Sequence, residues 1–157
     1  MAKEHHYKVN LVWKGNQGTG TSAYTSYSRD HEISVEGKPI LEVSSDPSFR
    51  GNKNRYNPEE LLVASLSSCH MLWYLHLCSE NGVIVLDYVE VAIGTMQETA
   101  VGGGAFSEVS LNPIVTVASE DMVELALALH SQANKLCFIA NSCNFPVYHN
   151  PECKSHN

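Results

Sequence analysis

The sequence predicts an α+β fold in which antiparallel strands are combined with two main helices. Alternating apolar and polar residues indicate a strand at residues 7–14, and β-rich runs indicate a hairpin at residues 83–97 and 106–117. Start and stop signals indicate a helix at residues 57–81, and apolar residues at three- or four-residue spacing indicate a second helix at 119–137. Runs of strands separated by single helices are typical of α+β proteins.

Size and charge limit the class of protein. The chain has 157 residues, of which 43% are hydrophobic and 17% charged, so we expect one globular domain over residues 1–157. The 17 acidic and 10 basic residues give a formal net charge of −7. Binding to nucleic acids or anionic membranes requires clustered Lys and Arg, so this balance argues against both kinds of partner.

The cysteine content and the N-terminal residues indicate a cytoplasmic protein. The first ten residues lack the apolar core and small-residue cleavage site of a secretion signal. Five cysteines on a chain without such a signal are expected to be reduced thiols, and the odd number leaves at least one unpaired within the chain. Redox chemistry is therefore open, whereas a structural disulfide framework is not expected.

Further strands and a long polar segment are expected before the first helix. Residues 21–28 and 31–35 have the composition of strands. Residues 40–57 contain an Asp-Pro pair, a glycine and three asparagines, which disfavour regular structure. Long loops of this kind are often functional, so this segment is a candidate part of the site.

The first helix has clear signals at both ends. Asn57 suits the N-cap, Pro58 the first helical position, and Glu59 and Glu60 the positive end of the helix dipole. Gly82 favours a stop, because glycine readily adopts the left-handed conformation beyond a helix C-terminus. Serines and histidines interrupt the apolar residues, which indicates a buried core helix and not a membrane span.

The other turns follow from glycine and proline. Glycines 102–104 connect the two runs of the central hairpin. After the second helix, residues 145–148 are expected to form a last short strand that ends before Pro151.

Two cysteines at corresponding helix positions are the main candidates for chemistry. Cys69 lies among apolar residues of the first helix, and Cys137 lies at the end of the second. Each can be a small buried packing residue, and the two can also form a dithiol pair. The spacing in the sequence leaves both interpretations open.

Metal and cofactor sites are not indicated. Cys69, His70, His76 and Cys78 carry ligand atoms, but Cys69 and His76 are two helical turns apart, and the chain has neither C-x-x-C nor H-x-x-x-H. None of the glycine-rich phosphate-binding motifs is present. The one run of glycines, at 102–104, joins two strands and therefore indicates a hairpin turn. We therefore expect no metal and no cofactor.

A family resemblance adds to this interpretation. The run NPEELL at residues 57–62, with Cys69 ten positions after Glu59, resembles the first motif of the OsmC/Ohr family of organic hydroperoxide reductases. The order of elements, the central hairpin and the second cysteine at 137 are similar too. The resemblance spans about residues 7–151 and implies an OsmC-like fold and an intertwined dimer.

The resemblance implies a thiol peroxidase. In that family a first cysteine attacks the peroxide, a second resolves it, and an arginine and a glutamate activate the first. Matched by position, these roles fall to Cys69, Cys137 and Glu59, with the arginine in the loop before the NPEE motif. Of the three arginines in the chain, Arg50 matches the OsmC-type placement best, Arg55 is the reserve, and Arg29 corresponds more loosely to the Ohr-type position.

One position departs from the family pattern. Family members commonly have proline after the second cysteine, whereas Phe138 follows Cys137 here. Cys143, six residues further on, therefore competes as the resolving thiol. For Cys78 and Cys153 we expect no role beyond packing or exposure.

The chemistry of thiols agrees with these implied roles. Only the thiolate attacks a peroxide bond, and Cys69 lies too far inside its helix for the dipole to stabilise that charge. A guanidinium can supply the positive charge, and a carboxylate can orient it. The sulfenic acid formed by the attack condenses with a second thiol, and a reductant restores both. That reductant is expected to be a dihydrolipoyl protein, thioredoxin or a small thiol.

Helix geometry makes the expected partner a second copy of the chain. Glu59 and Cys69 are ten residues apart, which is about 15 Å along a helix axis and about 80° around it. A glutamate cannot reach its own Cys69 over that distance. We therefore expect a homodimer with each site formed by Cys69 of one chain and Glu59 of the other.

Two other classes of function remain. The chain can be a non-catalytic OsmC-like protein that senses oxidants or binds a ligand. It can also be a metal-binding protein that uses the Cys and His side chains around His70. Oxidation without turnover distinguishes the first of these from a peroxidase, and metal that co-purifies with the protein identifies the second.

Overall fold

The computed structural model describes residues 3–156. Backbone contacts divide the chain into two units, one ending at Leu61 and the other beginning at Leu62. The boundary falls inside the helix α1 (Pro58–Glu80), so the two units share that helix. The expectation of one domain over residues 1–157 stays a prediction.

The first unit contains a three-stranded antiparallel sheet. Its strands lie in the order β1 (Asn10–Trp13), β2 (His31–Ser34) and β3 (Leu41–Val43). The first two confirm the strands expected near residues 7–14 and 31–35. The third lies in the segment expected to be a loop, where its three residues pair with β2 before the turn at Asp46 and Pro47.

The strand expected at residues 21–28 is wrong. The segment forms turns and bends with one isolated bridge. Asn16 Oδ1 accepts hydrogen bonds from the N–H groups of Gly18 and Gly20 at 2.9 and 3.0 Å, and the Ser26 hydroxyl donates to a nearby carbonyl. Such local hydrogen bonds from side chain to backbone compete with strand pairing.

Both ends of α1 form as the sequence predicts. The Glu60 N–H donates to Asn57 Oδ1 at 2.7 Å, and the Asn57 N–H donates to Glu60 Oε2 at 3.1 Å. At the other end Gly82 has a φ of 72°, and the Val83 N–H donates to the Cys78 carbonyl. By length and composition alone α1 could cross a membrane. Five of its side chains are buried within the chain, as in a core helix.

The second unit has a four-stranded mixed sheet. The hairpin of β4 (Val85–Glu98) and β5 (Gly104–Val117) confirms the expected antiparallel pair. The short strands β6 (Val147–His149) and β7 (Glu152–Ser155) pair with β5 in parallel. This sheet is therefore mixed, because a helix between β5 and β6 returns the chain to the same end of the sheet. The pattern does not predict β7, since three of its four residues are polar.

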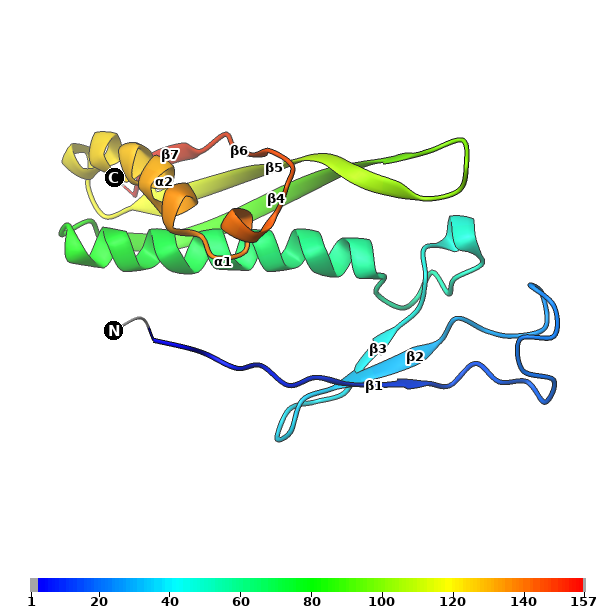
Figure 1. Ribbon diagram of the computed structural model, residues 1–157. Helices are drawn as coiled ribbons and strands as arrows, with labels where there is room; N and C mark the ends of the chain where they lie inside the picture. The colour runs from blue at the N-terminus through cyan, green and yellow to red at the C-terminus, as the bar shows by residue number, and fades with distance from the viewer. Residues whose placement is uncertain (1–2, 157) are drawn as a thin grey trace. The chain divides into compact units, whose positions relative to one another are not determined.

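Two helices cover one face of this sheet (Figure 1). The helix α2 (Val123–Leu136) follows a short 3₁₀ turn, η2 (Glu120–Met122), and the two together occupy nearly all of the expected second helix. Alternate residues of β5 point towards the helices and are buried: Val109, Leu111, Pro113, Val115 and Val117. The core of the unit therefore lies between β5 and the two helices.

A pair of buried histidines joins the two helices inside this core. His70 of α1 and His130 of α2 are both 0% exposed, and His70 Nε2 lies 3.0 Å from His130 Nδ1. The Tyr74 ring stacks on His130 with the ring centroids 3.8 Å apart, and His149 of β6 approaches His70 from the sheet. The far ring nitrogens, His70 Nδ1 and His130 Nε2, have no hydrogen-bond partner among the described residues.

Acid should destabilise the fold through this pair. Burial, and then the neighbouring His149, lowers the pKa of His70 from 6.5 to about 4. Burial, and then His70 and His149, lowers the pKa of His130 from 6.5 to about 3. Between these values and 6.5 the unfolded chain binds more protons than the folded one, so the free energy of unfolding should fall as the pH drops. Each tenfold difference in proton affinity is worth about 1.4 kcal/mol.

Urea unfolding at a series of pH values from neutral to acidic measures this loss. The double variant His70→Gln/His130→Asn lacks both imidazoles and should lose less stability over the same range. Parallel pH dependences for the wild type and the double variant would contradict the assignment.

Candidate functional site

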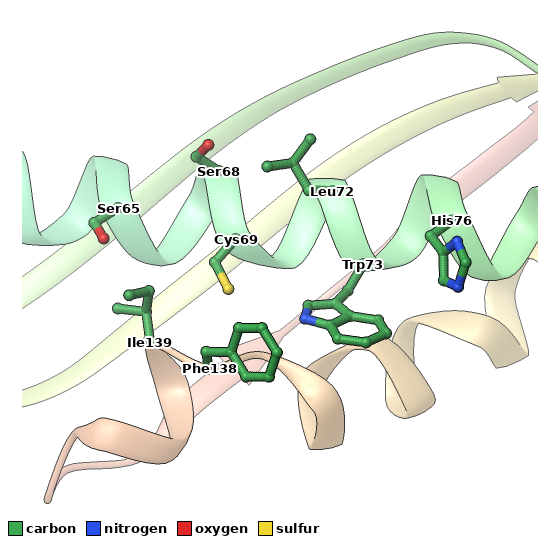
Figure 2. A pocket seen from close by; sticks show the side chains of 8 residues that line it. All are labelled: Ser65, Ser68, Cys69, Leu72, Trp73, His76, Phe138 and Ile139. Carbon is green, nitrogen blue, oxygen red and sulfur yellow. The ribbon is translucent and has the colours of Figure 1, made fainter. Parts of the chain in front are cut away.

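Cys69 lines an apolar pocket on the second unit. Its sulfur points from α1 towards the turn that follows α2, and the pocket has a volume of about 590 Å³ (Figure 2). The thiol is partly exposed, so a small molecule can reach it. The other lining residues are Ser65, Ser68, Leu72, Trp73, His76, Phe138 and Ile139.

The second unit brings Cys137 to Cys69. Cys137 is the first residue after α2, is 1% exposed, and lies close enough to Cys69 for the two thiols to affect each other's ionisation. The Ala140 N–H donates to Cys137 Sγ at 3.4 Å and helps to hold the sulfur in place. Burial above all, together with the neighbouring Cys69, raises the pKa of Cys137 from 9.0 to about 11, so this thiol stays protonated at neutral pH.

The remaining cysteines lie elsewhere in the second unit. The Cys143 thiol donates to the Ile139 carbonyl at 3.3 Å and packs against the Leu66 cluster. Cys78 is buried in a separate core cluster against which Cys153 packs. Burial raises the pKa of all three thiols. Cys137 is therefore the thiol for which a contact with Cys69 is observed.

Aromatic side chains form one wall of the pocket. The Trp73 ring meets Phe138 edge to face, with the centroids 5.5 Å apart, and meets His76 in the same way at 5.7 Å. The sequence motifs do not single out this wall. One signal could have found Trp73, because it lies four residues after Cys69 and therefore on the same side of the helix. Phe138 is brought there only by the turn after α2.

Two of the three arginines have partners within the first unit. The Arg29 guanidinium lies over two tyrosine rings and donates to two backbone carbonyls. Arg55 forms ion pairs with Asp30 and Glu42 at 3.6 and 3.2 Å.

Arg50 differs from the other two arginines in its backbone conformation and in its lack of an ion pair among the described residues. It ends the 3₁₀ turn η1 (Pro47–Phe49), where Asp46 caps the first N–H groups and accepts from the Gly51 N–H. Its φ is 65°, the left-handed region that side chains rarely adopt, and it is the one non-glycine residue with positive φ among residues 3–156. Its side chain forms no ion pair within the described residues, and the residue is exposed.

The glutamates at the start of α1 have different environments. Glu60 is occupied by the capping box with Asn57. Glu59 Oε2 is buried and has no hydrogen-bond partner among the described residues. Because α1 is one continuous helix from Pro58 to Glu80, Glu59 and Cys69 are separated by about 15 Å along its axis. The structure therefore does not bring this carboxylate to the thiol of its own chain.

The described residues contain no group of three or more Cys, His, Asp or Glu side chains placed to hold a metal ion. The ligand atoms around His70 that the sequence singled out are divided by the helix. His70 and Cys78 are buried, whereas His76 lies in the pocket.

Solved structures resemble this chain over nearly its whole length. An OsmC-like protein of unknown function from Vibrio cholerae has 28% identity and a TM-score of 0.81, covering 94% of this chain and 99% of its own. An organic hydroperoxide resistance protein from Elizabethkingia anophelis has 18% identity and a TM-score of 0.70, covering 97% and 100%. A putative organic hydroperoxide resistance protein from Vibrio cholerae, with captopril in one of its active sites, has 22% identity and a TM-score of 0.63, covering 96% and 93%.

No curated protein matches the sequence significantly. The family model described as OsmC-like protein matches residues 51–150, which is more than half of the chain and includes both Cys69 and Cys137. The order of elements and the whole-chain likeness to the first Vibrio cholerae structure agree with that match. The chain therefore belongs to the OsmC-like family.

Proposed function

We propose that the protein is a cytoplasmic, thiol-dependent peroxidase that reduces organic hydroperoxides. One observation carries the proposal: a partly exposed thiol, Cys69, lines an apolar pocket and has a second, buried thiol, Cys137, as its neighbour. The pocket offers apolar surface to the carbon group of a hydroperoxide while the peroxide lies at the sulfur. Several structural neighbours are described as organic hydroperoxide resistance proteins.

The chemistry proceeds in three balanced steps. The Cys69 thiolate attacks the hydroperoxide, so the O–O bond breaks, the alkoxide takes up a proton to leave as an alcohol, and Cys69 becomes a sulfenic acid. The Cys137 sulfur then attacks this sulfenic acid. An S–S bond forms, the S–OH bond breaks, and hydroxide leaves as water with the Cys137 proton. A dithiol or two thiols reduce the disulfide by exchange and are themselves oxidised.

The proton on Cys137 fits the order of these steps. A thiol with a pKa of about 11 is a poor nucleophile towards peroxide at neutral pH. Cys69 is the more accessible of the two and attacks first. Cys137 then attacks within a pair that is already in contact, so proximity compensates for its low thiolate fraction.

Arg50 is the arginine we assign to Cys69. The other two arginines already have partners, whereas Arg50 presents its side chain to solvent from a well-defined turn. Backbone strain at a non-glycine residue is often retained at functional positions. A guanidinium there stabilises the thiolate and donates to the peroxide oxygens. The Glu59 carboxylate, whose buried Oε2 has no hydrogen-bond partner among the described residues, orients it.

We assign these charged groups to sites shared between two chains. The length of α1 separates Glu59 from Cys69 of the same chain, so the carboxylate must come from a partner. An uncovered apolar face supports a dimer: Val89, Val91 and Ile93 of β4 are 52%, 68% and 56% exposed. Such a face on an edge strand favours association with a second copy.

Replacing Cys69 by Ser should reduce hydroperoxide turnover to background, because no thiolate remains to attack the peroxide. Turnover is measured with cumene hydroperoxide and, for comparison, hydrogen peroxide, with dithiothreitol as the reductant. In the wild type, one equivalent of hydroperoxide should produce a 69–137 disulfide that peptide mass spectrometry detects.

Cys143→Ser is the matched control, because it removes a half-buried thiol of the same unit. It should leave turnover and the 69–137 disulfide intact. A dominant 69–143 disulfide would contradict the role of Cys137. Oxidation of Cys69 without turnover would indicate a sensor in place of an enzyme.

Replacing Arg50 by Met should slow peroxide reduction by about a hundredfold, because a charged donor to the reacting centre is lost. Arg50→Gly should slow it equally while stabilising the fold by about 1 kcal/mol, since glycine has no penalty at positive φ. Thermal unfolding and initial rates measure the two effects. Arg55→Met and Arg29→Met are the comparisons, and a larger rate loss in either would transfer the role to that residue.

Mixed dimers should test the shared site. A heterodimer of one Cys69→Ser chain and one Glu59→Ala chain retains one intact pair, Cys69 of the second chain with Glu59 of the first. Its activity should rise to about one working site per dimer, whereas each mutant alone stays inactive or nearly so. Isolated heterodimers that remain as inactive as the parents would mean that each site is built within one chain.

A further inference from the structure

The buried histidine pair links the two helices that carry the thiols. Among the described residues, the contact between His70 Nε2 and His130 Nδ1 is the one hydrogen bond between α1 and α2. The two rings are nearly parallel, at 9°, with centroids 5.3 Å apart. An N···N distance of 3.0 Å at that separation places them edge to edge, which is the arrangement for a directional hydrogen bond.

The thiols lie close to this bond along both helices. His70 follows Cys69 directly in α1, and His130 precedes Cys137 by seven residues, which is about two turns of α2. A change in the position or rotation of α2 at His130 therefore moves the residue at its end, Cys137, relative to Cys69.

We propose that the His70–His130 hydrogen bond is a clamp that positions the Cys137 thiol for disulfide formation with Cys69. These histidines are positioning residues, since neither contacts the pocket that holds the substrate. The role in turnover rests on the proposed function. The role in disulfide geometry does not, because it concerns only the closing of the thiol pair.

The clamp acts on disulfide formation, the step that tolerates the smallest displacement of the two sulfur atoms. A disulfide needs an S–S distance near 2 Å and a narrow range of dihedral angles, so small displacements of one cysteine reduce its rate and its stability. Misplacing reacting atoms by about 1 Å can cost about a hundredfold in rate. Neither imidazole can exchange its partner for water, because both side chains are fully buried.

Two double variants of identical composition separate a directional clamp from simple core packing. Gln carries its amide about as far from the backbone as histidine Nε2, and Asn about as far as Nδ1. The matched variant His70→Gln/His130→Asn therefore preserves the atoms that form the bond. The swapped variant His70→Asn/His130→Gln has the same total volume and polarity but displaces both amide groups along their side chains.

The test measures the equilibrium of the 69–137 disulfide against reduced and oxidised glutathione, with Cys78, Cys143 and Cys153 replaced by Ser in every protein. The matched variant should stay within about twofold of the parent. The swapped variant should form the disulfide about tenfold less favourably, which is about 30 mV for a two-electron couple. Tyr74→Phe, which keeps the ring on His130 and removes its hydroxyl, should leave the equilibrium unchanged.

Equal equilibria for the matched and swapped variants, both folded by near-ultraviolet circular dichroism, would contradict the clamp. If the swapped variant does not fold, the single variants His130→Asn and His130→Gln provide the same comparison. Turnover with hydroperoxide is measured in parallel. A parent protein that forms the disulfide with glutathione but does not reduce hydroperoxide would contradict the proposed function and not the clamp.

Discussion

The packing of α1 and α2 against β5 is the constraint on which the candidate site depends. Alternate residues of β5 are buried against both helices, so the helices cannot move far apart without exposing this core. Because Cys69 lies within α1 and Cys137 directly follows α2, the same packing that stabilises the unit also brings the two thiols into contact. The histidine pair adds a directional bond to a contact that is otherwise apolar.

The two thiols have different environments, and the difference determines what each can do. Cys69 is partly exposed in an apolar pocket, whereas Cys137 is buried and keeps its proton. The charged groups of the proposed mechanism lie in the other unit of the chain, on a strained turn and at the start of α1. A thiolate in this pocket requires such charges from elsewhere, because no lysine or arginine is among the residues that line it.

Local chemistry made much of the fold predictable. The ends of α1 follow from Asn57, Pro58 and Gly82, and the central hairpin follows from its glycines, because caps and turns depend on neighbouring residues. Two parts of the fold were not predicted, because hydrogen bonds outside the expected pattern decide them. Side-chain hydrogen bonds in the Asn16 region replace an expected strand, and β7 is mostly polar, so its pairing with β5 follows from tertiary contacts and not from its composition.

The sequence by itself determined the family, the long core helix and the candidate residues, because a capping motif and a cysteine at fixed spacing are local features of the chain. Tertiary structure decided that Cys137 contacts Cys69, that Phe138 and Trp73 form one wall of the pocket, and that His70 pairs with His130. It also gave Arg29 aromatic contacts and Arg55 ion pairs, whereas Arg50 forms no ion pair within residues 3–156. These facts join residues that are far apart in the chain, and their distances depend on how the helices pack, which no spacing along the sequence encodes.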